Sequence, residues 1–268
     1  MIPYSVLMSI YKKDNPDYFE ISLRSMLEQS YPPNEIILVK DGPITDELQN
    51  VIDSLNNGTI KEVALLENVG LGMALNEGIK SVSNELIARM DSDDYSFPLR
   101  CELQVKAFEE NPSLDIVGFP VQEFVGDINN IVGERLVPLT NDDIYSFARF
   151  RDPFNHPTVM YRKSFIQKVG GYSNYRKNQD TDLWIKMLSN GACCMNLPNK
   201  VFRFRFDEST YKKRKSWLST RLLITIRYKA WRSGFNSFAE FIIIMVTQLA
   251  IYLLPSKIQK ALYILFLR

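Results

Sequence analysis

One run of ten residues carries much of the structural information in this chain: Glu85-Leu86-Ile87-Ala88-Arg89-Met90-Asp91-Ser92-Asp93-Asp94. Glu85–Met90 is mostly apolar and predicts a buried strand. The next four residues bring three carboxylates together, and close like charges repel unless a cation or hydrogen-bond donors offset them. Oxygen ligands of this kind suit Mg²⁺ or Mn²⁺ beside a diphosphate, and a solvated acidic turn before the next helix is the alternative.

The elements on either side of this run alternate between strand and helix. Such an order predicts an α/β fold with a mostly parallel sheet, whose ligands bind at the carboxyl ends of the strands. Asp41 and Asp91 both fall at such ends. The expected strands are Tyr4–Tyr11, Glu35–Val39, Val63–Leu66 and Ile116–Val125, with a hairpin through Asp127–Asn130; the expected helices are about Pro16–Gln29, one capped by Thr45, Leu71–Val82, and one from Pro98 to about Asn111.

The composition excludes several kinds of site. The chain has 268 residues with one histidine and three cysteines. A multi-histidine metal site is excluded, and His156 alone is left for a Ser-His-Asp or Cys-His arrangement. Cys193 and Cys194 are adjacent and Cys101 is distant, which fits neither a zinc cage nor a disulfide framework. We expect a reducing compartment and oxygen-ligand metal chemistry.

The net charge of +1 hides an uneven distribution. Residues 1–198 hold 18 Lys and Arg against 28 Asp and Glu, a net charge of −10, whereas residues 199–268 hold 14 against 3, a net charge of +11. A basic tail on an acidic body is expected to face a membrane surface or nucleic acid.

The tail itself has a helical and apolar pattern. From Ser216 onwards basic and apolar residues interleave, just after the basic run Lys212–Lys215. Phe241–Leu254 is 14 mostly apolar residues, shorter than the roughly 20 that a spanning helix needs. An in-plane interfacial helix is favoured and a core helix is the alternative, with a further apolar segment at Ala261–Leu267. No secretory signal opens the sequence.

Four other features have both a structural and a functional interpretation. Asp41-Gly42 is either a common turn or a nucleotide contact. The run from Asn68 to Leu75 starts like a dinucleotide-binding fingerprint, but Leu75 stands where the third glycine should be. Asp180 and Asp182 lie at a helix start, where acidic residues are favourable without any function. His156 is either a diphosphate contact or a structural residue.

Taken together, the motifs of residues 5–184 resemble the family 2 glycosyltransferases, which are inverting enzymes of the GT-A fold. Nine short motifs in the right order carry the resemblance, although each is weak alone. They are Ser5–Ser9, Ser25–Pro32, Glu35–Gly42, Asn68–Leu71 with Asn76–Ile79, Ala88–Asp94, Pro98–Arg100, His156–Met160, Gly170–Tyr172 and Gln179–Trp184.

The resemblance implies a role for each matching residue. Asp41 would contact the uracil of a UDP-sugar, Asp91 the ribose region, and Asp93 would ligate Mn²⁺ or Mg²⁺. Asp180 would be the catalytic base, although Gln179 replaces the Glu that precedes it in the family. The remaining contacts would come from Asn68, Gly70, Ser92, Arg100 and His156 for the nucleotide-sugar, and from Trp184 and Asp182 for the acceptor or sugar.

These roles make chemical sense without histidine or cysteine. A divalent metal would neutralise the diphosphate leaving group, and one carboxylate would take the proton of the acceptor hydroxyl. The sequence therefore predicts a metal-dependent inverting transferase that acts on a lipid-diphosphate-linked acceptor in bacterial O-antigen, capsule or exopolysaccharide synthesis. It is expected at the cytoplasmic face of the inner membrane.

The expected domains are a GT-A catalytic domain at 1–206, with a nucleotide-sugar-binding half (1–97) and an acceptor-binding half (98–206), and a helical membrane-associating tail at 207–268. One alternative is a sugar nucleotidyltransferase of similar fold, although its expected first loop, residues 9–17, has no glycine. The other is a non-enzymatic protein whose basic tail binds nucleic acid. The apolar character of the tail disfavours it.

Overall fold

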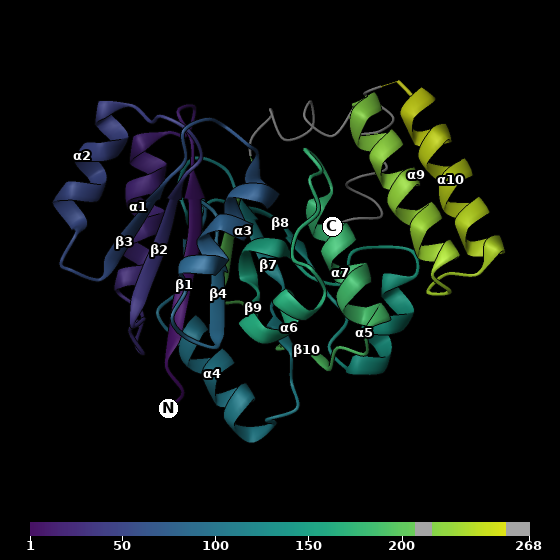
Figure 1. Ribbon diagram of the computed structural model, residues 1–268, viewed down its shortest axis with the longest axis horizontal. Coiled ribbons are helices and arrows are strands. Elements are labelled where there is room, and N and C mark those ends of the chain that lie inside the picture. The colour runs from purple at the N-terminus through teal and green to yellow at the C-terminus, as the bar shows by residue number, and fades with distance from the viewer. Residues whose placement is uncertain (207–215, 256–268) are drawn as a thin grey trace.

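The computed structural model describes residues 1–206 and 216–255 and has a mixed α/β architecture (Figure 1). Its main sheet has seven strands in the order β10-β6-β9-β4-β1-β2-β3, and a second sheet has the order β5-β11-β7-β8. The main strands are β1 (Tyr4–Ile10), β2 (Glu35–Lys40), β3 (Ile60–Ala64), β4 (Leu86–Met90), β6 (Ile116–Gly118), β9 (Met160–Arg162) and β10 (Cys194–Asn196). The second sheet contains β5 (Tyr95–Ser96), β7 (Val121–Phe124), β8 (Ile131–Arg135) and β11 (Phe202–Arg205).

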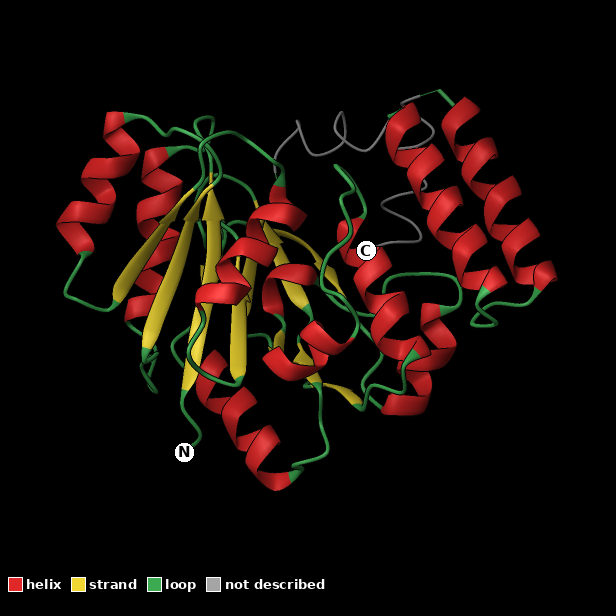
Figure 2. Cartoon of the chain, in the orientation of Figure 1, coloured by secondary structure: helices red, strands yellow, loops and turns green. Residues whose placement is uncertain are grey.

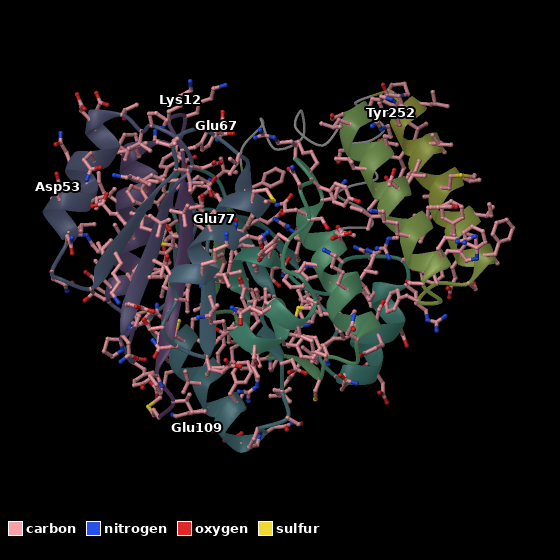
Figure 3. The ribbon with its side chains drawn as sticks, viewed as in Figure 1. Lys12, Asp53, Glu67, Glu77, Glu109 and Tyr252 are labelled. Atoms are coloured by element: carbon pink, nitrogen blue, oxygen red, sulfur yellow. The ribbon has the colours of Figure 1, made fainter. Side chains whose placement is uncertain are left out.

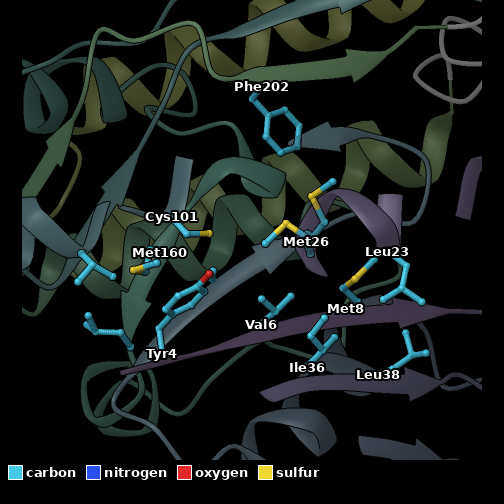
Figure 4. Packing of buried hydrophobic residues seen from close by; sticks show 14 of the residues in the cluster. Tyr4, Val6, Met8, Leu23, Met26, Ile36, Leu38, Cys101, Met160 and Phe202 are labelled. Atoms are coloured by element: carbon cyan, nitrogen blue, oxygen red, sulfur yellow. The ribbon is translucent and has the colours of Figure 1, made fainter. Parts of the chain in front are cut away.

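Helices cover both faces of the main sheet (Figure 2). Successive residues of a strand point to opposite faces, so both must be apolar when both are covered. Val6 and Met8 of β1 pack with α1 (Pro16–Leu27), α2 (Asp46–Leu55) and α4 (Arg100–Glu110), as Figure 4 shows in part. Leu7 packs on the other face with α3 (Leu71–Ser81), α5 (Asn141–Ala148), α6 (Lys163–Lys168) and α7 (Gln179–Ser189).

The strand order of the main sheet reverses between β1 and β4. From β1 the chain adds β2 and β3 on one side and then crosses to place β4 on the other. Such a reversal point leaves a crevice at the carboxyl ends of the strands, where α/β proteins bind their ligands. Lys12 and Glu67, which follow β1 and β3, lie at this end, and Glu109 of α4 lies at the opposite end (Figure 3).

Most predicted elements are confirmed, with Thr45 capping α2 through the Leu48 amide. The single strand expected at Ile116–Val125 is wrong. It is divided into β6 and β7, which belong to different sheets, because the chain leaves the main sheet around Phe119-Pro120. The hairpin through Asp127–Asn130 is confirmed by the antiparallel pairing of β7 and β8.

The main sheet contains strands from both sides of the predicted boundary between residues 97 and 98. The strand β9 comes from the second half of the chain, yet it pairs with β4 of the first half. The two proposed halves therefore share one sheet, and each of the two core clusters on its faces contains residues of both halves.

Between residues 216 and 255, the described part of the tail, the chain forms the helices α9 (Trp217–Arg232) and α10 (Phe238–Leu253), which lie side by side (Figure 1). Ile226 and Ala230 of α9 pack on Ile185 of α7, and Arg149 forms a 2.9 Å ion pair with Glu240 of α10. The helix pair is therefore attached to the body. Within residues 1–206 and 216–255, no helix is long and apolar enough to cross a membrane. The predicted segments Lys212–Lys215 and Ala261–Leu267 lie outside the described residues.

Candidate active site

Three carboxylates converge in the turn after β4. Oxygen atoms of Asp91, Asp93 and Asp94 all lie within 4.8 Å of one another. Asp93 is exposed, Asp91 and Ser92 are partly buried, and Asp94 is 1% exposed. One oxygen of Asp94 accepts a bond from the Arg205 amide, and Oδ2, although buried, has no partner among the described residues. Hard oxygen donors with spare capacity are what Mg²⁺ and Mn²⁺ require, so these residues fit such an ion.

Donors from two distant segments and from the end of β4 hold this turn in place. Ser22 of α1 donates to the Asp91 carbonyl at 2.5 Å, and the Arg205 Nε donates to the Asp93 carbonyl at 2.8 Å. Buried Arg89 pairs with the Asp91 carboxylate. These contacts offset part of the repulsion that the sequence predicts for this turn.

Desolvation and the charges of neighbouring carboxylates both raise pKa values in this turn. Desolvation of its carboxylate, followed by the charges of Asp91 and Asp14, raises the pKa of Asp93 to about 6. Burial, followed by the charges of Asp93 and Asp91, raises the pKa of Asp94 well above its usual value. Asp14, in the loop after β1, thus brings a fourth carboxylate to the crevice between β1 and β4.

Asp41 fixes a second loop at the same end of the sheet. Its carboxylate accepts bonds from the amides of Val69 (2.7 Å) and Gly70 (3.0 Å) and from the Asn68 side chain (2.8 Å). In this structure Asp41 and Asn68 therefore shape the glycine loop, and the uracil contact of Asp41 stays a prediction.

The glycines of this loop allow the start of α7 to approach closely. Gly70 has φ +93°, and a Cβ there would lie 2.9 Å from the Arg176 guanidinium. A Cβ at Gly72 would itself lie 3.2 Å from the Gln179 side chain. Arg176 also donates to the Asn68 side chain at 2.8 Å. The loop thus joins the end of β2 to the segment that carries Asp180.

Asp180 lies partly buried in the first turn of α7, and its Oδ1 accepts a 3.0 Å bond from the Thr181 amide. Burial and then the negative charge of Asp152 raise the pKa of Asp180 to about 6, while Arg89 acts in the opposite direction. Arg89 also lowers the pKa of Asp93 and Asp94, so its charge acts on both the acidic turn and Asp180.

Two predicted nucleotide-sugar contacts lie inside the protein. Arg100 is 0% exposed and donates to the Arg89 carbonyl at 2.7 Å, beneath the end of β4. His156 is buried and shares a 2.8 Å hydrogen bond with the Tyr172 hydroxyl. Burial, then the Arg89 charge, lowers the pKa of His156 well below its usual value, so the ring is neutral. Both side chains are buried, and their contact with a nucleotide-sugar stays a prediction.

The two residues predicted to contact the acceptor are also buried and make contacts within the protein. Trp184 is 1% exposed, and its ring packs edge-on against Phe154 and His156. Asp182 is 6% exposed, forms a 2.9 Å ion pair with Lys186 and accepts a bond from Ser173. Trp184 and Asp182 thus pack within the protein, and their contact with an acceptor or sugar stays a prediction.

Sequence reasoning missed Arg205, Asp14 and Asp152. Arg205 lies 111 residues from Asp94 and has no motif around it, and neither carboxylate stands in a recognisable pattern. The position of Asp14 just after β1 was a usable signal, because that loop borders the crevice.

Comparison with known proteins agrees with this arrangement. The model of glycosyl transferase family 2 matches residues 5–170. Over 261 residues the chain is 34% identical to a UDP-Gal:alpha-D-GlcNAc-diphosphoundecaprenol beta-1,3-galactosyltransferase of Escherichia coli, covering 97% of this chain and 94% of the relative. It is also 34% identical over 265 residues to the amylovoran biosynthesis glycosyltransferase AmsE of Erwinia amylovora, covering 97% of each.

Solved structures show the same fold. S. aureus TarS (residues 1–349) in complex with UDP-GlcNAc has a TM-score of 0.68 at 18% identity, covering 92% of this chain and 72% of that one. The mannosyltransferase PcManGT of Pyrobaculum calidifontis, in complex with GDP-Man and Mn²⁺, has a TM-score of 0.66 at 17% identity, covering 95% and 71%. The fold is that of the GT-A transferases, and the chain belongs to glycosyl transferase family 2 and is a glycosyltransferase.

Proposed function

We propose that this enzyme transfers a sugar from a UDP-sugar to a sugar carried on a lipid diphosphate, with inversion, during bacterial surface-polysaccharide synthesis. One observation carries the proposal. The carboxylates of Asp91, Asp93 and Asp94 lie within 4.8 Å of one another in the turn after β4, and the glycine loop at the same end of the sheet contacts the segment that carries Asp180. The relative named for UDP-Gal and an undecaprenol-diphosphate acceptor supports the substrate class.

The donor is assigned to the crevice between β1, β4 and the glycine loop. Asp91 and Ser92 face the nucleotide, and Asp41 holds Asn68 and Gly70 in the shape that borders it. Asp93, with Asp91 and Asp94, is assigned to Mn²⁺ or Mg²⁺. When bound, such an ion offsets the charge that develops on the diphosphate leaving group.

Asp180 is assigned as the base. A pKa of about 6 leaves its carboxylate deprotonated at neutral pH, and also makes it a stronger proton acceptor than an ordinary aspartate. It takes the proton of the acceptor hydroxyl as that oxygen attacks the anomeric carbon from the face opposite the leaving group. One displacement of this kind inverts the anomeric configuration.

We also assign the tail to the membrane surface that holds the acceptor lipid. The residues Ile243, Val246, Ala250 and Leu253 follow helical spacing along α10 and are exposed, Leu253 at 79%. We call this set the α10 stripe. The exposed cations Arg221 and Arg232 of α9 are nearby in the helix pair. An apolar stripe beside basic residues is the pattern of a helix pair that lies in an anionic interface.

The direct test uses the purified full chain, a panel of UDP-sugars starting with UDP-Gal, Mn²⁺ or Mg²⁺, and a synthetic lipid-diphosphate GlcNAc acceptor. We expect a product one sugar longer with at least one donor, and its loss in Asp180→Asn. Wild-type turnover by Asp180→Asn would overturn the assigned base, and transfer of a nucleotidyl group to a sugar phosphate would overturn the reaction class.

A further inference from the structure

Asp152 is an acidic residue beside the candidate base that the proposed mechanism does not use. It lies in the segment between α5 and the 3₁₀ turn His156–Thr158, and its side chain is 41% exposed. Its Oδ2 accepts a 2.9 Å hydrogen bond from the Thr181 hydroxyl. Its Oδ1 lies 4.0 Å from the Arg227 guanidinium of α9.

Thr181 connects this carboxylate to Asp180. The Thr181 side chain bonds to Asp152, and the Thr181 amide donates to Asp180 Oδ1 at 3.0 Å. Thr181 is 2% exposed, so its conformation is fixed by packing. One buried residue in the first turn of α7 therefore bonds to both carboxylates, to that of Asp180 through its amide and to that of Asp152 through its hydroxyl.

Arg227 connects Asp152 to the C-terminal helix pair. Its guanidinium is 3% exposed and donates to the Ala148 carbonyl at 2.6 Å and, at 3.3 Å, to that of Arg149. These carbonyls end α5, where a cation is favourable. Because Arg227 is fixed by these bonds, its charge stays 4.0 Å from the Asp152 carboxylate.

We propose that Asp152 is a positioning residue for Asp180: tied to Thr181 on one side and to Arg227 of α9 on the other, it fixes the first turn of α7 and the charge environment of the base. The proposal rests on the role proposed above for Asp180. It gives the C-terminal helices a part in the active site in addition to any contact with a membrane.

The charged groups that act on the two carboxylates come from β4, α9 and the segment after α5. Asp152 raises the pKa of Asp180, whereas Arg89 of β4 lowers it, and the neutral Tyr172 is close enough for Asp180 to raise its pKa. Around Asp152, partial desolvation raises the pKa, and Arg227 and Arg151 lower it. Removing the Asp152 charge therefore makes Asp180 easier to deprotonate and a weaker base.

The test measures kcat and KM of the full-length enzyme from pH 5 to 8.5. For Asp152→Asn we expect the acid limb of the kcat profile to move down by about 0.5–1 pH unit and the plateau kcat to fall roughly 3- to 10-fold. Each KM should stay within about twofold, because a positioning residue does not bind substrate. The matched control is Asp142→Asn, an exposed aspartate of α5. It should behave as wild type.

A second pair of variants isolates the link through Thr181. Thr181→Val removes the hydroxyl at nearly constant volume and should lower kcat about tenfold, whereas Thr181→Ser should stay within about twofold of wild type. Thermal melting of each variant shows whether it is folded. If Asp152→Asn does not fold, the two Thr181 variants still test whether the link to Asp152 positions Asp180.

Two results would overturn the inference while leaving the proposed function in place. One is an Asp152→Asn profile identical to that of Asp142→Asn, with Asp180→Asn inactive. The other is a large rise in acceptor KM at unchanged kcat, which would make Asp152 a substrate-binding residue. Wild-type turnover by Asp180→Asn would instead defeat the proposed base, and the inference with it.

Discussion

Asp93 is the exposed member of the acidic turn, and we predict that it is indispensable for turnover. Asp91 is engaged by Arg89, and Asp94 is engaged by the Arg205 amide, which leaves the Asp93 carboxylate to face an incoming ion. Asp93→Asn should lower kcat/KM at least about 100-fold, because charge stabilisation at the leaving group is worth several kcal/mol. Initial rates at saturating Mn²⁺ measure this loss.

The exposed Asp53→Asn is the control for Asp93→Asn and should retain wild-type rates. Treating the wild-type enzyme with EDTA should abolish turnover, and added Mn²⁺ or Mg²⁺ should restore it. Full activity of Asp93→Asn in the presence of EDTA would show that the reaction needs no divalent metal.

The raised pKa of Asp180 predicts a specific pH dependence. A base acts only when deprotonated, so a pKa of about 6 means that the active fraction falls as pH drops through 6. Below that point kcat should fall about tenfold per pH unit, and above pH 7 it should level off. A kcat that is constant from pH 5 to 7.5 would be incompatible with Asp180 as the base.

Glu35 gives a prediction about stability. It is 2% exposed and accepts bonds from the Ser5 hydroxyl, the Ser83 amide and Lys61, each at 2.6 Å. Burial alone would raise the pKa of Glu35, but these bonds lower it to about 2. Because the folded-state pKa is depressed, the stabilisation is complete above pH 4.5 and is lost as pH falls towards 2.

Glu35→Gln should therefore lower the free energy of unfolding at pH 7 by about 2–3 kcal/mol. Its stability should also change less than that of wild type between pH 5 and 3. Urea denaturation at each pH measures both, with exposed Glu110→Gln as the control. Equal losses in wild type and Glu35→Gln on acidification would contradict this assignment.

At the scale of elements, α10 makes the membrane assignment testable. Replacing Ile243, Val246 and Leu253 with Ser removes most of the apolar area of the α10 stripe. Each side chain contributes about 1.5 kcal/mol or more when buried, so vesicle binding should weaken at least tenfold. Co-sedimentation with vesicles containing anionic lipid measures this, and the exposed Leu136→Ser is the control.

Wild-type enzyme should also bind neutral vesicles more weakly than anionic ones, and increasingly so at low salt. If the triple variant sediments with anionic vesicles as well as wild type does, the α10 stripe is not the surface that contacts lipid.

The regular elements were predictable because they follow local rules. Apolar periodicity located the first four strands and the helices between them, and Thr45 marked the start of α2. Ile116–Val125 was mispredicted because periodicity alone does not reveal where a strand changes sheet. The register of β9, antiparallel between β4 and β6, depends on contacts far apart in sequence and has no local signal.

At the scale of the whole molecule, the candidate active site contains residues from Asp14 to Arg205. The motif residues of β4 and α7 could be identified from sequence, because they resemble a known pattern. Arg205 and Asp152 could not, because their contacts form only when distant segments fold together. The burial of Arg100 also depends on distant segments, so the family motif that contains this residue did not predict it.

The stereochemistry of the product tests the central claim most directly. Wild-type enzyme should convert a UDP-α-hexose into a β-linked product, identified by the large H1–H2 coupling of the new sugar in the proton NMR spectrum. Asp180→Asn should form none at a detectable rate. An α-linked product would contradict a single displacement assisted by Asp180.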